Sequence, residues 1–313
     1  MNLNESKLWK EIHQQDECVR ECLKYNLPIL KEIAFNIKQR NIKNIIFAAR
    51  GSSEHAAQVA KYVFEIYTDM FVNIAAPSIT TCYQGHVNYQ NALVVGISQS
   101  GGAQDVYQVM KKCVDDGGIC VSITNEPECL MSTIGHYQLN NHCGIETSIT
   151  AAKSYITQLT ILIALAYQIS ENQELFNLLE QLPDIIKDSF QLENQVQNVI
   201  PFFRNSEHLL IFGRGLLYGL VQESELKIQE TSYLDARCYS ASDYQHGPIA
   251  TSLSFVPTIF FIADKQTDKS IIQLHQRLKE EKNIFSLIIS NKDNISELGD
   301  LSIKIPHQYD GLS

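Results

Sequence analysis

The chain has 313 residues, of which 44% are hydrophobic, and its 25 basic and 35 acidic side chains give a formal net charge of −10. This length suits two domains of ordinary size, and an acidic balance without clusters of Lys and Arg argues against nucleic-acid binding. There is no run of 18 apolar residues and no apolar N-terminal segment, so neither a membrane span nor a secretory signal is expected. We therefore expect a cytoplasmic protein whose eight cysteines are reduced.

A helical segment, residues 1–42, opens the chain, because its apolar residues recur at roughly helical spacing. From residue 43 to residue 171, apolar strands alternate with helices. This alternation indicates a first α/β domain with a parallel sheet that helices cover on both faces. The expected strands are 44–49, 71–76, 92–98, 119–124 and a short one near 137–139, and the expected helices are 53–67, 105–114 and 150–169.

A polar helical connector, residues 172–205, leads to a second domain, residues 206–313, in which the pattern restarts. A strand at 209–212 is followed by Gly-Arg-Gly and a helix, as the first strand of the chain is followed by Ala-Arg-Gly and a helix. Such a repetition is typical of a duplicated fold. Later strands are expected at 258–263, 285–290 and 301–305. Because a long helix closes the first domain, we expect a closing helix and a tail to be missing from the second.

Two loops of the first domain have the composition of anion-binding sites. Residues 50–53 (Arg-Gly-Ser-Ser) and 98–102 (Ser-Gln-Ser-Gly-Gly) each connect an apolar strand to a helix. Ligands bind at the carboxyl ends of parallel strands, and helix N-termini supply free N–H groups and a positive dipole end. Either loop alone fits an ordinary turn with N-capping serines. Two such loops in one sheet favour a phosphate site.

The helix after Gly-Arg-Gly carries Glu223, Lys227 and Glu230 on one face, at spacings of four and three residues. The chain then reaches His246, which precedes a Gly-Pro turn. A carboxylate and an imidazole are the groups that proton transfer on a sugar requires. On spacing alone, a solvated charged face and a structural or exposed histidine explain the same residues.

Two further charged residues flank the start of the last helix of the first domain. Glu146 is expected to orient a substrate amine or a partner side chain, or else to be a first-turn carboxylate at a helix N-terminus. Lys153 is expected to pair with Glu146 or with phosphate, or else to lie at the surface. The histidines are dispersed without paired spacing, so no metal site is expected, and no cofactor is implied.

Five segments in a fixed order resemble the sugar isomerase (SIS) family, in particular its double-SIS members: the isomerase half of glucosamine-6-phosphate synthase and the SIS-type glucosamine-6-phosphate deaminases. The resemblance implies an α/β fold with two tandem SIS domains, each a mostly five-stranded parallel sheet flanked by helices. It departs from the family at Ala103, where members carry a hydroxyl residue that binds phosphate. The segments are 48–65, 94–105, 146–159, 213–234 and 239–250.

The resemblance also implies roles for individual residues. Glu230 moves a proton between C1 and C2 of the sugar, Lys227 contacts the sugar near these carbons, and His246, from the neighbouring subunit of a homodimer, assists ring opening. The residues implied in phosphate binding are Ser53, Ser98, Gln99 and Ser100, with Gly51 and Ser52 nearby.

The resemblance implies that the chain is an aldose–ketose isomerase or a deaminase that acts on an amino-hexose phosphate. It would convert glucosamine 6-phosphate to fructose 6-phosphate and ammonia, or run in reverse with ammonia. Two alternatives remain open: a deglycase for fructosamine phosphates, and a non-catalytic regulator that binds a sugar phosphate.

Overall fold

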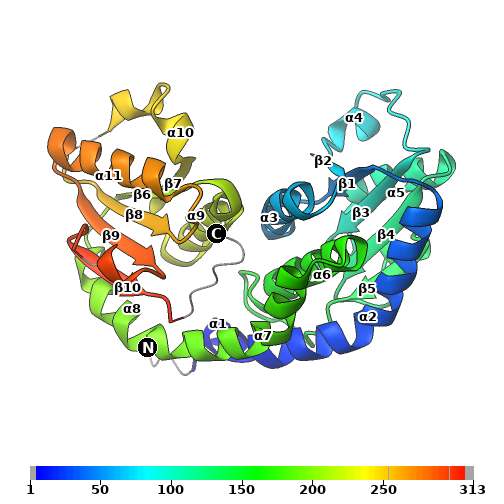
Figure 1. Ribbon diagram of the computed structural model, residues 1–313, viewed down its shortest axis with the longest axis horizontal. Helices are drawn as coiled ribbons and strands as arrows, with labels where there is room; N and C mark the ends of the chain where they lie inside the picture. Colours follow the sequence, from blue (N-terminus) through cyan, green and yellow to red (C-terminus); the bar gives the residue numbers. More distant parts are fainter. Residues whose placement is uncertain (1–4, 253, 296, 307–313) are drawn as a thin grey trace. The chain divides into compact units, whose positions relative to one another are not determined.

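The computed structural model describes residues 5–252, 254–295 and 297–306. The chain divides into two compact units, Met1–Pro183 and Asp184–Ser313, and each is built around its own sheet (Figure 1). The boundary falls inside the connector expected at 172–205. Within the described ranges, no helix is long and apolar enough to cross a membrane.

The first unit contains the expected alternation of strands and helices. The N-terminal helical segment is divided in two at His13 and Gln14, where the backbone leaves the helical path. The helices of this unit are α1 (Lys7–Ile12), α2 (Gln15–Gln39), α3 (Ser52–Tyr67), α4 (Ser78–Thr81), α5 (Gln104–Asp115), α6 (Lys153–Ser170) and the start of α7 (Gln173–Ser189). The strands are β1 (Asn44–Ala48), β2 (Phe71–Ile74), β3 (Ala92–Ile97), β4 (Ile119–Thr124) and β5 (Tyr137–Asn140).

The five strands of the first unit form one parallel sheet in the order β2-β1-β3-β4-β5. The chain runs from β1 to one side of the sheet and from β3 to the other. Right-handed crossovers therefore place α3 and α5 on opposite faces. Packing agrees, because Phe47 of β1 meets Phe64 of α3, whereas the next residue, Ala48, belongs to a core cluster with Met110 of α5.

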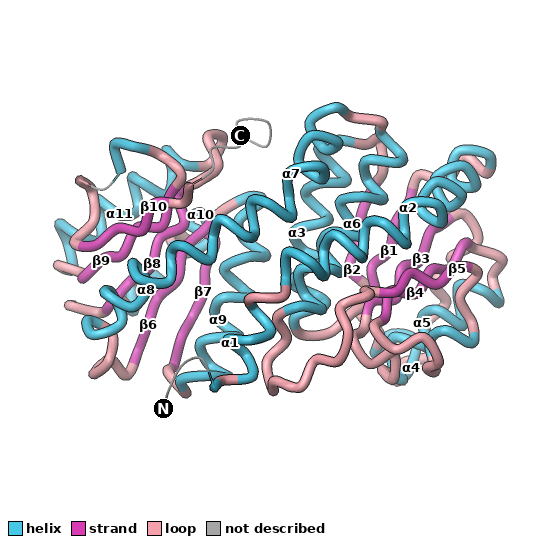
Figure 2. Tube along the Cα trace, turned by 90° about the horizontal axis from the view of Figure 1, so that it is seen from below, coloured by secondary structure: helices cyan, strands magenta, loops and turns pink. Residues whose placement is uncertain are grey.

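The second unit repeats this strand order. Its sheet runs β10-β9-β8-β6-β7, so each strand has a counterpart in the first sheet, and both sheets are drawn in magenta in Figure 2. The helices are α8 (Glu193–Val199), α9 (Tyr218–Ser232), α10 (Ala241–Tyr244) and α11 (Asp268–Lys282). The strands are β6 (His208–Gly213), β7 (Asp235–Ser240), β8 (Pro257–Ile262), β9 (Phe285–Ser290) and β10 (Leu301–Lys304).

A buried polar group, His275 of α11, ties this helix to the second sheet. Its Nε2 lies 3.1 Å from Oγ of Ser286 on β9, and its ring packs edge-on against Phe260. The side chain is 2% exposed. Burial, together with the nearby Lys279 ammonium, lowers the pKa of His275 from 6.5 to about 4. His275 is therefore neutral in the folded protein at pH values where an unfolded histidine is charged.

We predict that His275 makes stability fall as the pH decreases from about 6.5 to about 4, because only the unfolded chain binds a proton there. A full shift of this size corresponds to about 3 kcal/mol. Urea unfolding of the second unit at pH 4.5 and pH 7 should show a smaller difference for His275→Gln than for the unaltered chain. His86→Gln, at an exposed position, is the control. An unchanged pH dependence in His275→Gln would contradict this assignment.

Candidate functional site

The two Ser-containing loops meet at the point where the strand order of the first sheet reverses. β1 and β3 are neighbours, paired from Asn44↔Ala92 to Ala48↔Gly96. The loops that follow them therefore leave the same edge of the sheet side by side. In open α/β sheets this reversal opens a crevice at the carboxyl ends of the strands, and ligands bind there. The structure thus brings the predicted phosphate-binding residues together at one place.

Glycines allow both loops to take their paths. Gly101 has φ +63°, and a Cβ at this position would lie 2.2 Å from Sγ of Cys129. Gly51 has φ +54° and ψ −133° and directly precedes α3, a conformation that a residue with a side chain rarely adopts. Any other residue at position 101 would push the second loop out of place.

Two helix N-termini open at this crevice. The residues that precede α3 and α5, Gly51 and Ala103, make no side-chain capping hydrogen bond. The first-turn N–H groups and positive dipole ends of these helices are consequently suited to an anion. Of the serines, Ser53 is buried, Ser98 is half-buried and Ser100 is exposed.

Backbone bonds hold the second loop in position. The carbonyl of Gln99 accepts a bond from the N–H of Asn125 at 2.9 Å, and the carbonyl of Gly101 accepts one from Met131 at 3.1 Å. Oγ of Ser100 accepts from the N–H of Gly102 at 3.3 Å. The loop is therefore anchored to the segment after β4, which sequence reasoning did not connect with the site.

Glu146 is not in the first turn of α6, as the simpler expectation had it, but lies in the loop before this helix and reaches its N-terminus. Its Oε1 accepts from the N–H groups of Ala152, Lys153 and Ser154 at 2.9, 2.7 and 3.2 Å, and its Oε2 accepts from the Ser154 hydroxyl. Its carboxylate thus caps α6. Sequence reasoning missed Glu11 of α1, a buried carboxylate that binds the backbone and hydroxyl groups of residues 147–148.

Lys153 is buried, with 3% exposure, so the alternative of a surface lysine is wrong. Its Nζ donates to Oε1 of Gln14 and to the carbonyl of Ile145, both at 3.0 Å. These bonds join α6 to the turn before α2 and to the loop before α6. The Lys153 ammonium thus supports the loop before α6, whereas Glu146 binds the backbone N–H of Lys153.

The second unit brings the three predicted charged residues of α9 into one cluster. Nζ of Lys227 lies 3.3 Å from Oε1 of Glu223 and 3.0 Å from Oε2 of Glu230. Glu223 is buried, whereas Lys227 and Glu230 retain 23% and 31% of their side-chain exposure. Glu230 is thus held by Lys227 and still reachable. His246 lies on the exposed turn after α10.

The reversal point of the second sheet, between β6 and β8, has a different chemistry. Gly215, in the loop after β6, has φ +66°, and a Cβ there would lie 3.2 Å from Oδ2 of Asp264, in the loop after β8. Asp264 is buried and accepts from the hydroxyl of Thr267 at 3.1 Å. A buried carboxylate makes this crevice unsuited to phosphate, in contrast to the Ser-rich crevice of the first unit.

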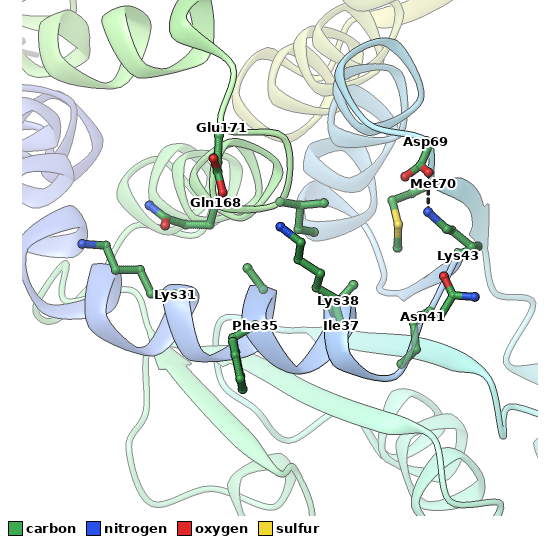
Figure 3. Close-up of a pocket in the computed structure, with 13 residues that line it drawn as sticks. Lys31, Phe35, Ile37, Lys38, Asn41, Lys43, Asp69, Met70, Gln168 and Glu171 are labelled. Atoms are coloured by element: carbon green, nitrogen blue, oxygen red, sulfur yellow. Dashed lines mark hydrogen bonds and ion pairs between the residues drawn. The ribbon is translucent and has the colours of Figure 1, made fainter.

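A cavity of about 440 Å³ lies at the opposite end of the first sheet, next to the starts of β1 and β2. Lys38 of α2 points toward Gln168 and Glu171 across it, and Phe35 points away (Figure 3). α2 and α6 both end here, and lysines near helix C-termini offset the negative dipole end. The charge of Lys38 in this cavity is therefore explained by the end of α2.

Comparison with known proteins agrees with this architecture. Residues 39–167 match the family described as SIS domain. The chain is 30% identical over 315 residues to glutamine–fructose-6-phosphate aminotransferase (isomerizing) of Wigglesworthia glossinidia brevipalpis, a match that covers 93% of this chain and 51% of that protein. The chain thus spans about half the length of the curated relatives it matches.

Two solved structures show the same fold. The C-terminal domain of glucosamine-fructose-6-phosphate aminotransferase from Francisella tularensis has a TM-score of 0.86 at 22% identity, covering 98% of this chain and 91% of that one. Glucosamine-6-phosphate deaminase from Thermotoga maritima has a TM-score of 0.73 at 20% identity, covering 98% and 90%. The match to the SIS domain family, residues 39–167, therefore lies within the first unit. The second shares its strand order, and its assignment as a second SIS domain stays a prediction.

We predict that Gly101→Ala destabilises the first unit while Gly102→Ala is tolerated. At position 101 the new methyl meets Cys129 and the backbone is left-handed, whereas at 102 its nearest neighbour is Oγ of Ser100 at 3.6 Å. The left-handed backbone alone costs about 1–2 kcal/mol, and the clash adds to it. Thermal unfolding of both variants is the measurement. Equal melting temperatures would show that the loop does not need this glycine.

Proposed function

We propose that this chain, whose residues 39–167 match the SIS domain family, acts on a phosphorylated amino sugar. It would convert glucosamine 6-phosphate and water to fructose 6-phosphate and ammonia, or catalyse the reverse, in which water is released. The observation that carries the proposal is the pairing of β1 with β3, which sets two uncapped helix N-termini and the serines beside each other. The relatives named as aminotransferase and deaminase support this class of substrate.

Phosphate binding falls to the crevice of the first unit. Ser53, Ser98 and Ser100 would supply hydroxyl donors, and the first turns of α3 and α5 would supply N–H groups. Charge-assisted bonds of this kind are stronger than those to a neutral sugar hydroxyl. The ligand would therefore be recognised chiefly through its phosphate.

Proton transfer falls to the charged cluster on α9. Glu230 would take the proton from C2 of the open-chain sugar and return it to C1, and the ammonium of Lys227, 3.0 Å from Glu230, would stabilise negative charge on the substrate oxygen. Glu223 is a positioning residue, because it holds Lys227 from the buried side. Such general acid–base groups contribute roughly 10²–10⁴-fold each, and this chemistry needs no redox cofactor.

His246 would act in a homodimer. Its side chain is exposed on the turn after α10, so it is available to a substrate held by a neighbouring subunit. A two-fold dimer would place the same contact on both chains. His246 would then donate the proton that opens the sugar ring.

We predict that Glu230→Gln abolishes exchange of the substrate C2 proton with solvent while binding of glucosamine 6-phosphate stays nearly unchanged. The amide is almost isosteric with the carboxylate but cannot accept the proton. NMR in deuterated solvent measures the exchange, and calorimetry measures the binding. Glu225→Gln is the control, because Glu225 lies on the same helix but pairs with Cys238. Exchange that survives in Glu230→Gln would leave Glu230 without the catalytic role.

The same assay separates the alternatives. A deglycase would turn over fructosamine phosphates and leave glucosamine 6-phosphate unchanged. A regulator would bind the sugar phosphate without exchanging its C2 proton in any variant. Turnover of glucosamine 6-phosphate that depends on Glu230 is expected only of the isomerase or deaminase.

We predict that His246→Ala and Glu230→Gln chains, each inactive alone, regain activity when mixed. If His246 serves the neighbouring subunit, random pairing gives about a quarter of the wild-type active sites, since half the dimers are mixed and each holds one intact site. Activity against mixing ratio and light scattering are the measurements. An active monomer, or a mixture that stays inactive after proven subunit exchange, would contradict the shared site.

A further inference from the structure

We infer that the ion pair between Arg50 and Asp105 sets the charge preference of the phosphate crevice, because Arg50 neutralises a carboxylate that would otherwise repel a phosphate dianion. This inference rests on the proposed phosphate-binding function of the first unit. It assigns to Arg50 and Asp105 a role in specificity, the balance of charge at the crevice, which the uncharged serines of the two loops cannot perform. The ligand class it concerns is a phosphomonoester, which carries close to two negative charges near pH 7.

The pair joins the two loops of the crevice. Arg50 directly precedes Gly51 in the loop after β1, and Asp105 lies in the first turn of α5, after the second loop. Both Nε and an Nη nitrogen of Arg50 lie 2.8 Å from Oδ2 of Asp105. The other oxygen of Asp105 accepts from the N–H of Val106 at 2.9 Å. Asp105 thus divides its charge between Arg50 and the start of α5.

Asp105 and a bound phosphate would both interact with the positive dipole end of α5. A negative charge in the first turn of a helix is stabilised by the dipole, and Asp105 occupies this position at the N-terminus of α5 that faces the crevice. Glu54 adds a second acidic residue, in the first turn of α3. Two carboxylates at the two helix N-termini would weaken binding of a dianion by direct repulsion.

Arg50 is the one cation in the two loop segments, 49–53 and 98–105. Its guanidinium keeps N–H donors beyond those used on Asp105, and its side chain is 53% exposed. Position 103 is alanine and offers no hydroxyl. The charge of Arg50 is therefore the feature of these loops that offsets the acids, and it does so whether or not the guanidinium itself touches the phosphate.

The test is a double-mutant cycle on phosphate affinity. Calorimetry would compare glucosamine 6-phosphate with glucosamine for Arg50→Gln, Asp105→Asn and the double variant. We expect Arg50→Gln to weaken binding of the phosphorylated sugar roughly tenfold, Asp105→Asn to bind it at least as tightly as the wild type, and the double variant to recover to within about threefold of the wild type. Affinity for glucosamine should not change.

A matched control removes the same charge at the other end of the same strand. Lys43 immediately precedes β1 and pairs with Asp69, so Lys43→Gln unpairs a carboxylate of this unit far from the crevice. It should leave phosphate affinity unchanged. A weaker effect of Arg50→Gln at 0.5 M salt than at 0.05 M salt is also expected, since screening reduces repulsion.

Two outcomes overturn the inference. If the double variant binds as weakly as Arg50→Gln, Arg50 acts through its own contact and not by neutralising Asp105. If Arg50→Gln binds as tightly as the wild type, the pair has no part in recognition. A wild-type protein that fails to distinguish glucosamine 6-phosphate from glucosamine is a different result, and it refutes the proposed phosphate site itself.

Discussion

The reversal of strand order between β1 and β3 is the constraint on which the site depends. It directs one crossover helix to each face of the sheet, so that α3 and α5 start at neighbouring positions on the same edge. Neither Gly51 nor Ala103 caps its helix with a side chain, and Gly51 and Gly101, both at positive φ, give the loops their path. Backbone topology thus collects N–H groups that no single sequence motif could supply.

The second unit shows that this topology permits an anion site without requiring one. Its strand order is the same, but buried Asp264 lies beside the loop after β6. The charged cluster of that unit, Glu223, Lys227 and Glu230, lies instead along α9. The same strand order therefore does not fix the chemistry at this edge, because the two units present different side chains there.

Much of the fold could be predicted from the sequence, because buried strands such as β3 and β4 read as continuous apolar runs. β7 was missed for a physical reason: it is an edge strand in which Ala236 alone is fully buried, so its sequence carries little apolar signal. The four-residue helices α4 and α10 are too short to show a period.

In the site, spacing predicted the cluster on α9. The capping of α6 by Glu146 and the links from Glu11 depend on contacts across the unit, which spacing does not reveal.

The contrast between Glu146 and Glu230 shows how helix position decides what a carboxylate can do. Glu146 meets an N-terminus, where three N–H groups occupy one of its oxygens, and a carboxylate held in this way has little capacity left for a substrate. Glu230 lies in the last turn of α9, which contains no basic residue, and the dipole disfavours a negative charge there. Lys227, three residues earlier, offsets that cost. A carboxylate near the negative end of a helix, paired with a partly exposed lysine, is locally unfavourable for stability. Such unfavourable arrangements concentrate at functional sites.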